Sequence, residues 1–124
     1  PADYQGRSIR LLLRGQAPGD WPRSMYYRYW MHLAHHYIYA HYGVRTERYK
    51  LIYYYAKALG ITGSLDEPKP PEWELFDLAQ DPIERKNVYC DPAYADTVAE
   101  LKAELACLRA EVGDDSEPWE GYPR

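Results

Sequence analysis

Residues 41–52 read HYGVRTERYKLI, and this stretch decides the fold. Aromatic and β-branched residues fill it and the sequence on either side, as they do in half-buried β-strands. Only the neighbourhood of Thr46 and Glu47 interrupts the pattern, which is a gap of hairpin length. The stretch therefore predicts two antiparallel strands, over residues 37–46 and 48–55, joined by a tight turn.

The alternation of side chains along a strand assigns residues of this hairpin to faces. In the first strand, His41, Gly43 and Arg45 share one face, and Tyr42 and Val44 lie on the other. We therefore expect His41 and Arg45 to point to the same side of the sheet.

Two further segments flank the hairpin and have strand-like composition. The first runs from Met25 to Trp30, and the second from Trp73 to Leu78. Between the hairpin and the second segment, residues 56–72 form a long loop rich in glycine and proline, and a loop of that length is typical of an insertion or a binding loop.

A long helix is predicted from Pro92 to Val112. Asp91 suits the N-cap and Pro92 the first helical position, while Gly113 ends the pattern. Apolar residues recur at steps of three and four and form one stripe. The stripe consists of Tyr94, Val98, Leu101, Leu105, Leu108 and Val112. Together these elements predict an α+β fold, a three- to four-stranded antiparallel sheet with one long C-terminal helix packed on one face.

Composition allows one domain and shows a marked division of charge. The 124 residues carry a net charge of -4, and fourteen tyrosines stand against one phenylalanine. Residues 1–62 hold nine Lys or Arg and three acids, whereas residues 63–124 hold six and sixteen. A basic, tyrosine-rich half could attract polyanions. Alternatively, the two halves neutralise each other or are both solvated faces.

The order of three motifs resembles the C-terminal subdomain of type I, formylglycine-dependent, arylsulfatase-like sulfatases. Residues 41–52 resemble its hairpin, and WELFDL at 73–78 with Asp81-Pro82 resembles its next strand and turn. QGRS at 5–8 with LLRG at 12–15 resembles the segment that joins it to the catalytic domain. The resemblance divides the chain into a linker over 1–24, the subdomain over 25–112 and a loose acidic tail over 113–124.

The resemblance implies sulfate-ester hydrolysis by a larger parent protein. Its chemistry uses a formylglycine, made inside a C/S-x-P-x-R motif, and a calcium ion. Neither Cys90 nor Cys107 lies in that motif, and no Asp, Asn and His cluster has calcium-site spacing. We therefore expect no catalytic residue, no metal ligand and no cofactor in this chain, which should be inert alone as a fragment. Sequence leaves open whether the two cysteines form a disulfide.

In such a parent, the subdomain's partners would be the catalytic domain of the same polypeptide and a sulfated substrate, which we expect to be a glycan. We expect His41 to help line the substrate pocket and Arg45 to pair with a sulfate or carboxylate. The alternative is that both bond to strand neighbours or to the missing domain. His32, His35 and His36 are expected to form a solvated or domain-facing cluster.

The rival interpretation is a stand-alone basic, tyrosine-rich module that binds sulfated glycan or single-stranded nucleic acid. Under the sulfatase interpretation, the sheet face without the helix should be a bare apolar patch that causes self-association. No apolar run approaches about 18 residues, so no membrane partner is expected. The sequence does not determine the cellular compartment, and a periplasmic or secreted location would suit the parent enzyme. Pro1 in place of Met suggests that the natural start lies upstream.

Overall fold

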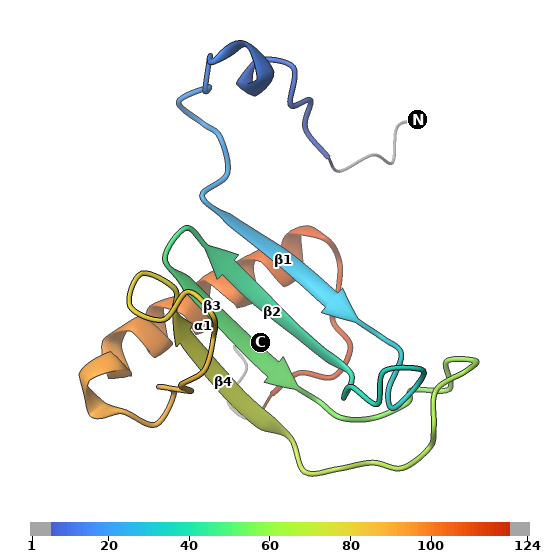
Figure 1. The fold of residues 1–124 in the computed structure, drawn as a ribbon. Coiled ribbons are helices and arrows are strands. Elements are labelled where there is room, and N and C mark those ends of the chain that lie inside the picture. The colour runs from blue at the N-terminus through green and yellow to red at the C-terminus, as the bar shows by residue number, and fades with distance from the viewer. Residues whose placement is uncertain (1–5, 120–124) are drawn as a thin grey trace.

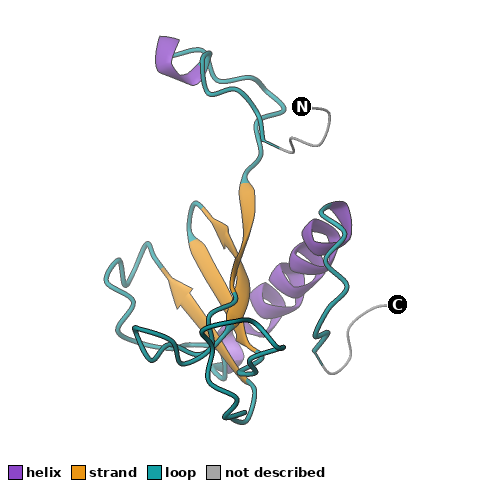
Figure 2. Cartoon of the chain, turned by 90° about the vertical axis from the view of Figure 1, so that its right-hand side faces the viewer, coloured by secondary structure: helices purple, strands orange, loops and turns teal. Residues whose placement is uncertain are grey.

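The computed structural model describes residues 6–119 and places one helix across one face of a four-stranded antiparallel sheet (Figures 1 and 2). The strands lie in the order β1-β2-β3-β4. Their bounds are β1 Ser24–Tyr29, β2 His41–Thr46, β3 Tyr49–Tyr54 and β4 Glu72–Asp77. The helices are the short η1 Leu12–Arg14 and η2 Pro92–Tyr94 and the long α1 Ala95–Glu111. The predicted α+β class is confirmed. Residues 1–5 of the predicted linker and 120–124 of the predicted tail lie outside the described part.

The predicted hairpin is present, with β2 shorter than the sequence pattern indicates. Val44 pairs with Leu51, and the Thr46 hydroxyl accepts a hydrogen bond from the Tyr49 amide at 2.8 Å across the turn. The chain before His41 is not strand, although the aromatic run begins at Tyr37. Tyr37 has a φ of 52°, a left-handed conformation that an extended strand does not contain.

The core lies between the sheet and α1. Its buried members are Ala40, Tyr42, Val44, Leu51, Tyr53, Tyr55, Leu75, Val88, Leu101, Leu105, Ala106 and Trp119. Because each strand contributes alternate residues, the period-two pattern places Tyr42, Val44, Leu51, Tyr53 and Leu75 on this one face. Burying a leucine of this kind stabilises a fold by about 2 kcal/mol.

The helix contributes an arginine to this core as well as its apolar stripe. Leu101 and Leu105 are buried as predicted, whereas Val112 is 39% exposed and Arg109 is fully buried. The Arg109 guanidinium lies 4.2 Å from the centre of the Tyr42 ring, and its Nη1 donates to the Tyr42 hydroxyl at 2.8 Å. A cation over an aromatic face is stabilised when water is excluded.

The chain after α1 folds back on the sheet. The Asp114 carboxylate accepts hydrogen bonds from Arg28 at 2.6 Å and from the Tyr26 hydroxyl, so it joins this segment to β1. Trp119 is 5% exposed and belongs to the core. Residues 113–119, which the sequence assigns to a loose tail, are therefore held by buried contacts.

Two loops, residues 30–40 between β1 and β2 and residues 55–71 between β3 and β4, contact each other at the end of the sheet through His32. Its Nδ1 accepts from the Ala40 amide at 3.1 Å, so the ring proton is on Nε2, which donates to the Glu67 carbonyl at 3.0 Å. His32 is fully buried, which makes the predicted solvated or domain-facing cluster wrong for this residue. His35 and His36 are exposed.

Residues 6–23 form an arm that projects beyond the sheet (Figures 1 and 2). The helical turn η1 ends at Gly15, whose φ of 71° is the left-handed cap that glycine adopts without strain. Arg7 pairs with Asp20 at 2.7 Å within the arm, and Leu13 is 79% exposed.

Candidate functional site

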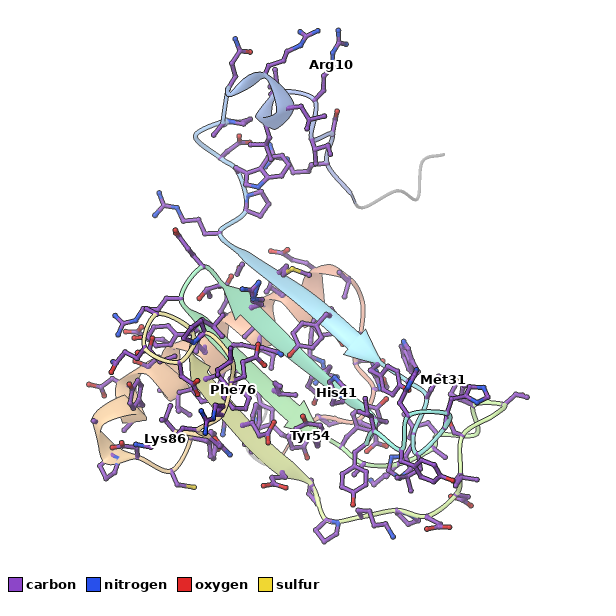
Figure 3. All side chains as sticks on the ribbon, in the orientation of Figure 1. Arg10, Met31, His41, Tyr54, Phe76 and Lys86 are labelled. Carbon is purple, nitrogen blue, oxygen red and sulfur yellow. The ribbon has the colours of Figure 1, made fainter. Side chains whose placement is uncertain are left out.

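The candidate site lies on the sheet face opposite α1, at the end where the two loops interlock. Strand register brings one residue from each strand into a row across this face. The row consists of Tyr29, His41, Tyr54 and Glu72. Figure 3 shows His41 and Tyr54 on the face turned toward the viewer, while α1 lies behind the sheet.

Aromatic rings surround the His41 imidazole. The Tyr29 ring stacks on it with centres 5.5 Å apart, and the Tyr54 ring lies 5.0 Å away. The His41 Nδ1 lies 2.7 Å from the Tyr39 carbonyl oxygen. Because a carbonyl can only accept, Nδ1 carries the proton in this hydrogen bond, and Nε2 of the neutral ring is left as an acceptor.

The protonation of His41 follows from its surroundings. Burial lowers the pKa of His41, and the nearby positive charge of Lys50 lowers it further. The hydrogen bond to the Tyr39 carbonyl and the charge of Glu74 oppose this shift in pKa. The net direction is downward, so the ring is uncharged at neutral pH. Chemically, it can accept a hydrogen bond from a hydroxyl or amide group.

Arg45 shares this face with His41, as predicted, but the two residues lie at opposite ends of β2. Four residue steps along a strand span about 13 Å. Arg45 is exposed beside the hairpin turn, in register with Met25 and Lys50. The structure therefore does not bring His41 and Arg45 together on one small ligand.

In the middle of the open face, Tyr27 of β1 packs over Gly43 of β2 and leaves no space for a ligand there. Gly43 lies beside Tyr27, and a Cβ atom at Gly43 would stand 2.6 Å from the Tyr27 hydroxyl oxygen. The ring of Tyr27 thus occupies the space that a side chain at position 43 would need. An aromatic residue that covers a glycine on the next strand protects backbone hydrogen bonds from water.

The open face is mixed in character and is not the apolar patch expected from the sequence. Tyr54 donates to Glu74 at 2.9 Å, and Lys50 pairs with Glu84 at 2.6 Å. The apolar side chain of Ile52 on this face is only 4% exposed. Most of the large exposed apolar side chains lie instead on the arm and the two loops. Self-association through the open face therefore stays a prediction.

Five of the nine cations in residues 1–62 form ion pairs with acids. The pairs are Arg7 with Asp20, Arg28 with Asp114, Arg48 with Asp77, Lys50 with Glu84 and Lys57 with Glu117. Four of these acids come from the acidic half, which agrees with mutual neutralisation. Such pairing does not favour a basic surface for polyanions.

The structure adds members to the row of His41 that the sequence did not identify. Tyr29 comes from β1 and Glu72 from β4, and both reach the row only through strand register. Aromatic composition marks both strands, but composition does not determine which residues become neighbours. Only the assignment of His41 to a face was available from the sequence.

Three further features of residues 6–119 concern metal-ligating side chains, cysteines and apolar helices. Within residues 6–119, no group of three or more His, Cys, Asp or Glu side chains could hold a metal ion. Cys90 and Cys107 are free and exposed. None of the helices between residues 6 and 119 has the length and apolar character needed to cross a membrane.

Comparison with known proteins gives one consistent family. The sequence model described as N-sulphoglucosamine sulphohydrolase, C-terminal, matches residues 1–111. An N-acetylglucosamine-6-O-sulfatase from Bacteroides thetaiotaomicron is 36% identical over 103 residues, which are 82% of this chain and 16% of that protein.

Solved structures show the same likeness. A protein solved in complex with its substrate, D-glucosamine-2-N,6-O-disulfate, is 32% identical and superposes with a TM-score of 0.76, covering 94% of this chain and 22% of the other. A 2-O glycosaminoglycan sulfatase is 28% identical with a TM-score of 0.66, covering 93% and 22%. The chain thus spans less than a quarter of the length of these relatives.

Proposed function

The chain belongs to the family of N-sulphoglucosamine sulphohydrolase C-terminal domains, and from this premise we propose that it packs on the catalytic domain of a sulfatase and forms one wall of its substrate cleft. The observation that carries the proposal is the agreement, in sequence and in fold, with one part of longer sulfatases. The partner is then the catalytic domain of the same polypeptide.

The substrate class that we propose is a glucosamine sugar sulfated at O6. The support is that the curated relative at 36% identity is named as an N-acetylglucosamine-6-O-sulfatase, and that the solved structure at 32% identity holds a glucosamine with a 6-O-sulfate as its substrate. These names describe the relatives, and they make a 6-O-sulfated glucosamine the first substrate to test on a polypeptide that contains this chain.

Within this cleft, His41 would contact the sugar and not its sulfate. The support is that burial lowers the pKa of His41, so the ring is neutral and its Nε2 can accept a hydrogen bond. A neutral acceptor suits a sugar hydroxyl, whereas a sulfate prefers donors or positive charge. Arg45 is a cation suited to sulfate, but its distance from His41 would place that contact elsewhere along the substrate.

The reactive groups would come from the rest of the polypeptide. The formylglycine and the calcium ion that such sulfatases use have no matching motif or ligand set in residues 6–119. The contribution of this chain would be shape, packing and contacts to the sugar. Alone it would release no sulfate.

Reconstitution tests the proposal. The catalytic portion and this chain are produced separately, mixed, and assayed for sulfate release from glucosamine 6-sulfate. We expect little release from either part alone and recovery on mixing. Full activity of the catalytic portion alone, or no recovery with both parts folded, would contradict the proposed role.

A second experiment addresses His41 in the full-length polypeptide. Replacing His41 by Ala removes one hydrogen-bond acceptor, so kcat/KM should fall roughly five- to tenfold, mainly through a higher KM. His36→Ala is the matched control, because His36 is exposed on a loop outside the row. An unchanged kcat/KM for His41→Ala would exclude a contact between His41 and the substrate.

A further inference from the structure

The two edge strands of the sheet differ in how their outer sides are covered. Beside β4, the Val88 amide donates to the Leu75 carbonyl at 2.9 Å, and the Leu75 amide donates to the Asn87 side chain at 3.0 Å. The Asn87 amide group also donates to the Trp73 carbonyl at 3.1 Å. The segment at 87–88 therefore satisfies the outward backbone groups of β4.

The outer side of β1 lacks a comparable cover in the described part of the chain. Its backbone pairs inward with β2 over all six residues. Among the described residues, the one further hydrogen bond to its backbone comes from the Tyr55 hydroxyl to the Tyr29 carbonyl at 3.3 Å, and Tyr55 follows β3 on the inner side of β1. Figure 1 shows β1 at the rim of the sheet with no strand beyond it. Unpaired groups on an edge strand are a template for another strand.

A groove of about 810 Å³ runs along this edge, between β1 and the C-terminal end of α1. Its apolar lining includes Met25, Leu108 and Val112, of which Met25 is 55% exposed. Glu111 and Asp115 add two exposed acids to the lining. The groove thus offers backbone groups, an apolar floor and negative charge.

We propose that an extended segment of the catalytic portion of the same polypeptide pairs with the outer edge of β1 and occupies this groove. The inference rests on the proposed function, because it requires a larger polypeptide. The segment would alternate apolar side chains toward Leu108 and Val112 and carry a basic residue toward Glu111 and Asp115. Main-chain hydrogen bonds would hold it, as in other cases of strand addition.

Two observations favour this occupant over a second copy of the chain. The chain covers only 22% of a solved relative, so most of such a protein is available to supply the segment. A second copy would present its own β1, whose one cation, Arg28, is already bound to Asp114 with a side chain only 4% exposed. Pairing β1 with β1 would bring no free positive charge from the strand itself to the acidic lining.

The sequence of β1 also suits pairing. Edge strands that stay solvated commonly carry lysine or proline, and Ser24–Tyr29 contains neither. Three of its six residues are tyrosines, which favour a sheet environment. An uncovered strand of this composition would be prone to aggregate unless the native protein covers it.

Amide hydrogen exchange tests the proposal on this chain and on the full-length polypeptide. We expect the outward amides of Ser24–Tyr29 to exchange at least roughly a hundredfold more slowly in the full-length polypeptide, while those of Tyr49–Tyr54, paired on both sides, serve as the internal reference. Equal exchange of β1 in both proteins would overturn the pairing. Protection of β1 in the isolated chain that rises with concentration, together with a dimer in sedimentation, would assign the groove to a second copy and also overturn it.

A pair of variants locates the contact. Met25→Lys places a charge on the free edge, and Ile83→Lys places one at an exposed position in the turn after β4, where the side chain is 69% exposed. We expect both to leave the Tm of the isolated chain unchanged and only Met25→Lys to lower that of the full-length polypeptide. Equal effects would count against the groove. Reconstituted activity with an unprotected β1 would refute this inference alone, whereas failed reconstitution would refute the proposed function.

Discussion

The two faces of the sheet satisfy their polar groups in different ways. On the face under α1, Arg28, Arg109 and Asp114 lie among tyrosine rings, with the two arginine side chains 4% and 0% exposed. On the open face, the Lys50–Glu84 pair keeps 24% and 33% of its side chains exposed. Charges and hydroxyls occur on both faces, so residue type does not distinguish them.

The comparison shows that burial decides what the polar groups do. Under the helix, water is excluded, and removal of one partner leaves another charge or hydroxyl unsatisfied. On the open face, water replaces a lost partner, so the same groups contribute little to stability and can be used for a ligand. The following changes test this difference, in order of expected effect.

The largest effect should come from Arg109→Ala. It removes the cation that bonds the Tyr42 hydroxyl and the Ser116 carbonyl, and we expect a loss of about 3–5 kcal/mol in the free energy of unfolding. Arg45→Ala on the open face is the control and should change it by less than about 0.5 kcal/mol. Urea denaturation measures both, and equal effects would contradict the comparison.

Acid should remove part of the stability of the covered face. Burial alone would raise the pKa of Asp114, but hydrogen bonds from Tyr26, Arg28 and Ser116 outweigh it and lower the pKa to about 2. A carboxylate with a lowered pKa stabilises the folded state above its unfolded pKa, and this contribution is lost as the pH falls from about 5 to 2. It amounts to roughly 2 kcal/mol.

Comparing the wild-type chain with Asp114→Asn isolates that contribution. The difference in the free energy of unfolding should be largest near pH 7 and should shrink toward pH 2, as chemical denaturation at each pH would show. A difference that is constant with pH would mean that the Asp114 charge has no such role.

A smaller effect is expected from removing one hydroxyl on each face. Tyr42→Phe leaves the Arg109 guanidinium and the Glu117 carbonyl without their shared hydroxyl, at a cost of about 1–2 kcal/mol. Tyr54→Phe removes a bond to Glu74 at a half-buried position and should cost less than about 1 kcal/mol. Thermal unfolding of the two variants measures both losses of stability. A larger loss for Tyr54→Phe than for Tyr42→Phe would contradict the comparison of the two faces.

The smallest effect is expected from Glu84→Ala. A partly exposed ion pair such as Lys50–Glu84 contributes about 0–1 kcal/mol, and salt screens it. The difference between wild type and variant should therefore decline as sodium chloride is added to the unfolding assay. A loss above about 2 kcal/mol would show that this pair behaves as a buried one.

Features set by local sequence were predictable. The hairpin at 41–54 follows from a period of two around a short gap, and α1 follows from its apolar stripe. The predicted cap Asp91 precedes η2, the short helix before α1, and its carboxylate accepts from the Ala93 amide at 3.0 Å. The observed strand ends differ from the predicted ones by a residue or more. Strand β2 begins at His41 and not at Tyr37, because Tyr37 takes a left-handed conformation. The face of His41 was predicted for the same reason of period.

Features set by distant partners were not predictable. Arg109 is buried in contact with Tyr42, a partner 67 residues earlier in the sequence. No local pattern marks such a charged residue as part of a core. The buried ring of His32 bonds backbone groups of Ala40 and Glu67. Because every residue type has these backbone groups, the sequence does not identify the partners of His32. The neighbours of His41 across the sheet depend on register, which the sequence does not state for β1 and β4.

The return of the chain to the sheet after α1 has a consequence for the time that folding takes. The bonds that close the covered face join residues far apart in sequence, with Tyr26 and Asp114 separated by 88 positions and Ser24 and Glu104 by 80. Closing such long loops costs entropy before the contacts form, so chains of this kind fold slowly for their size. During synthesis the strands emerge first and must wait for the helix and residues 113–119, with their tyrosines still exposed to solvent.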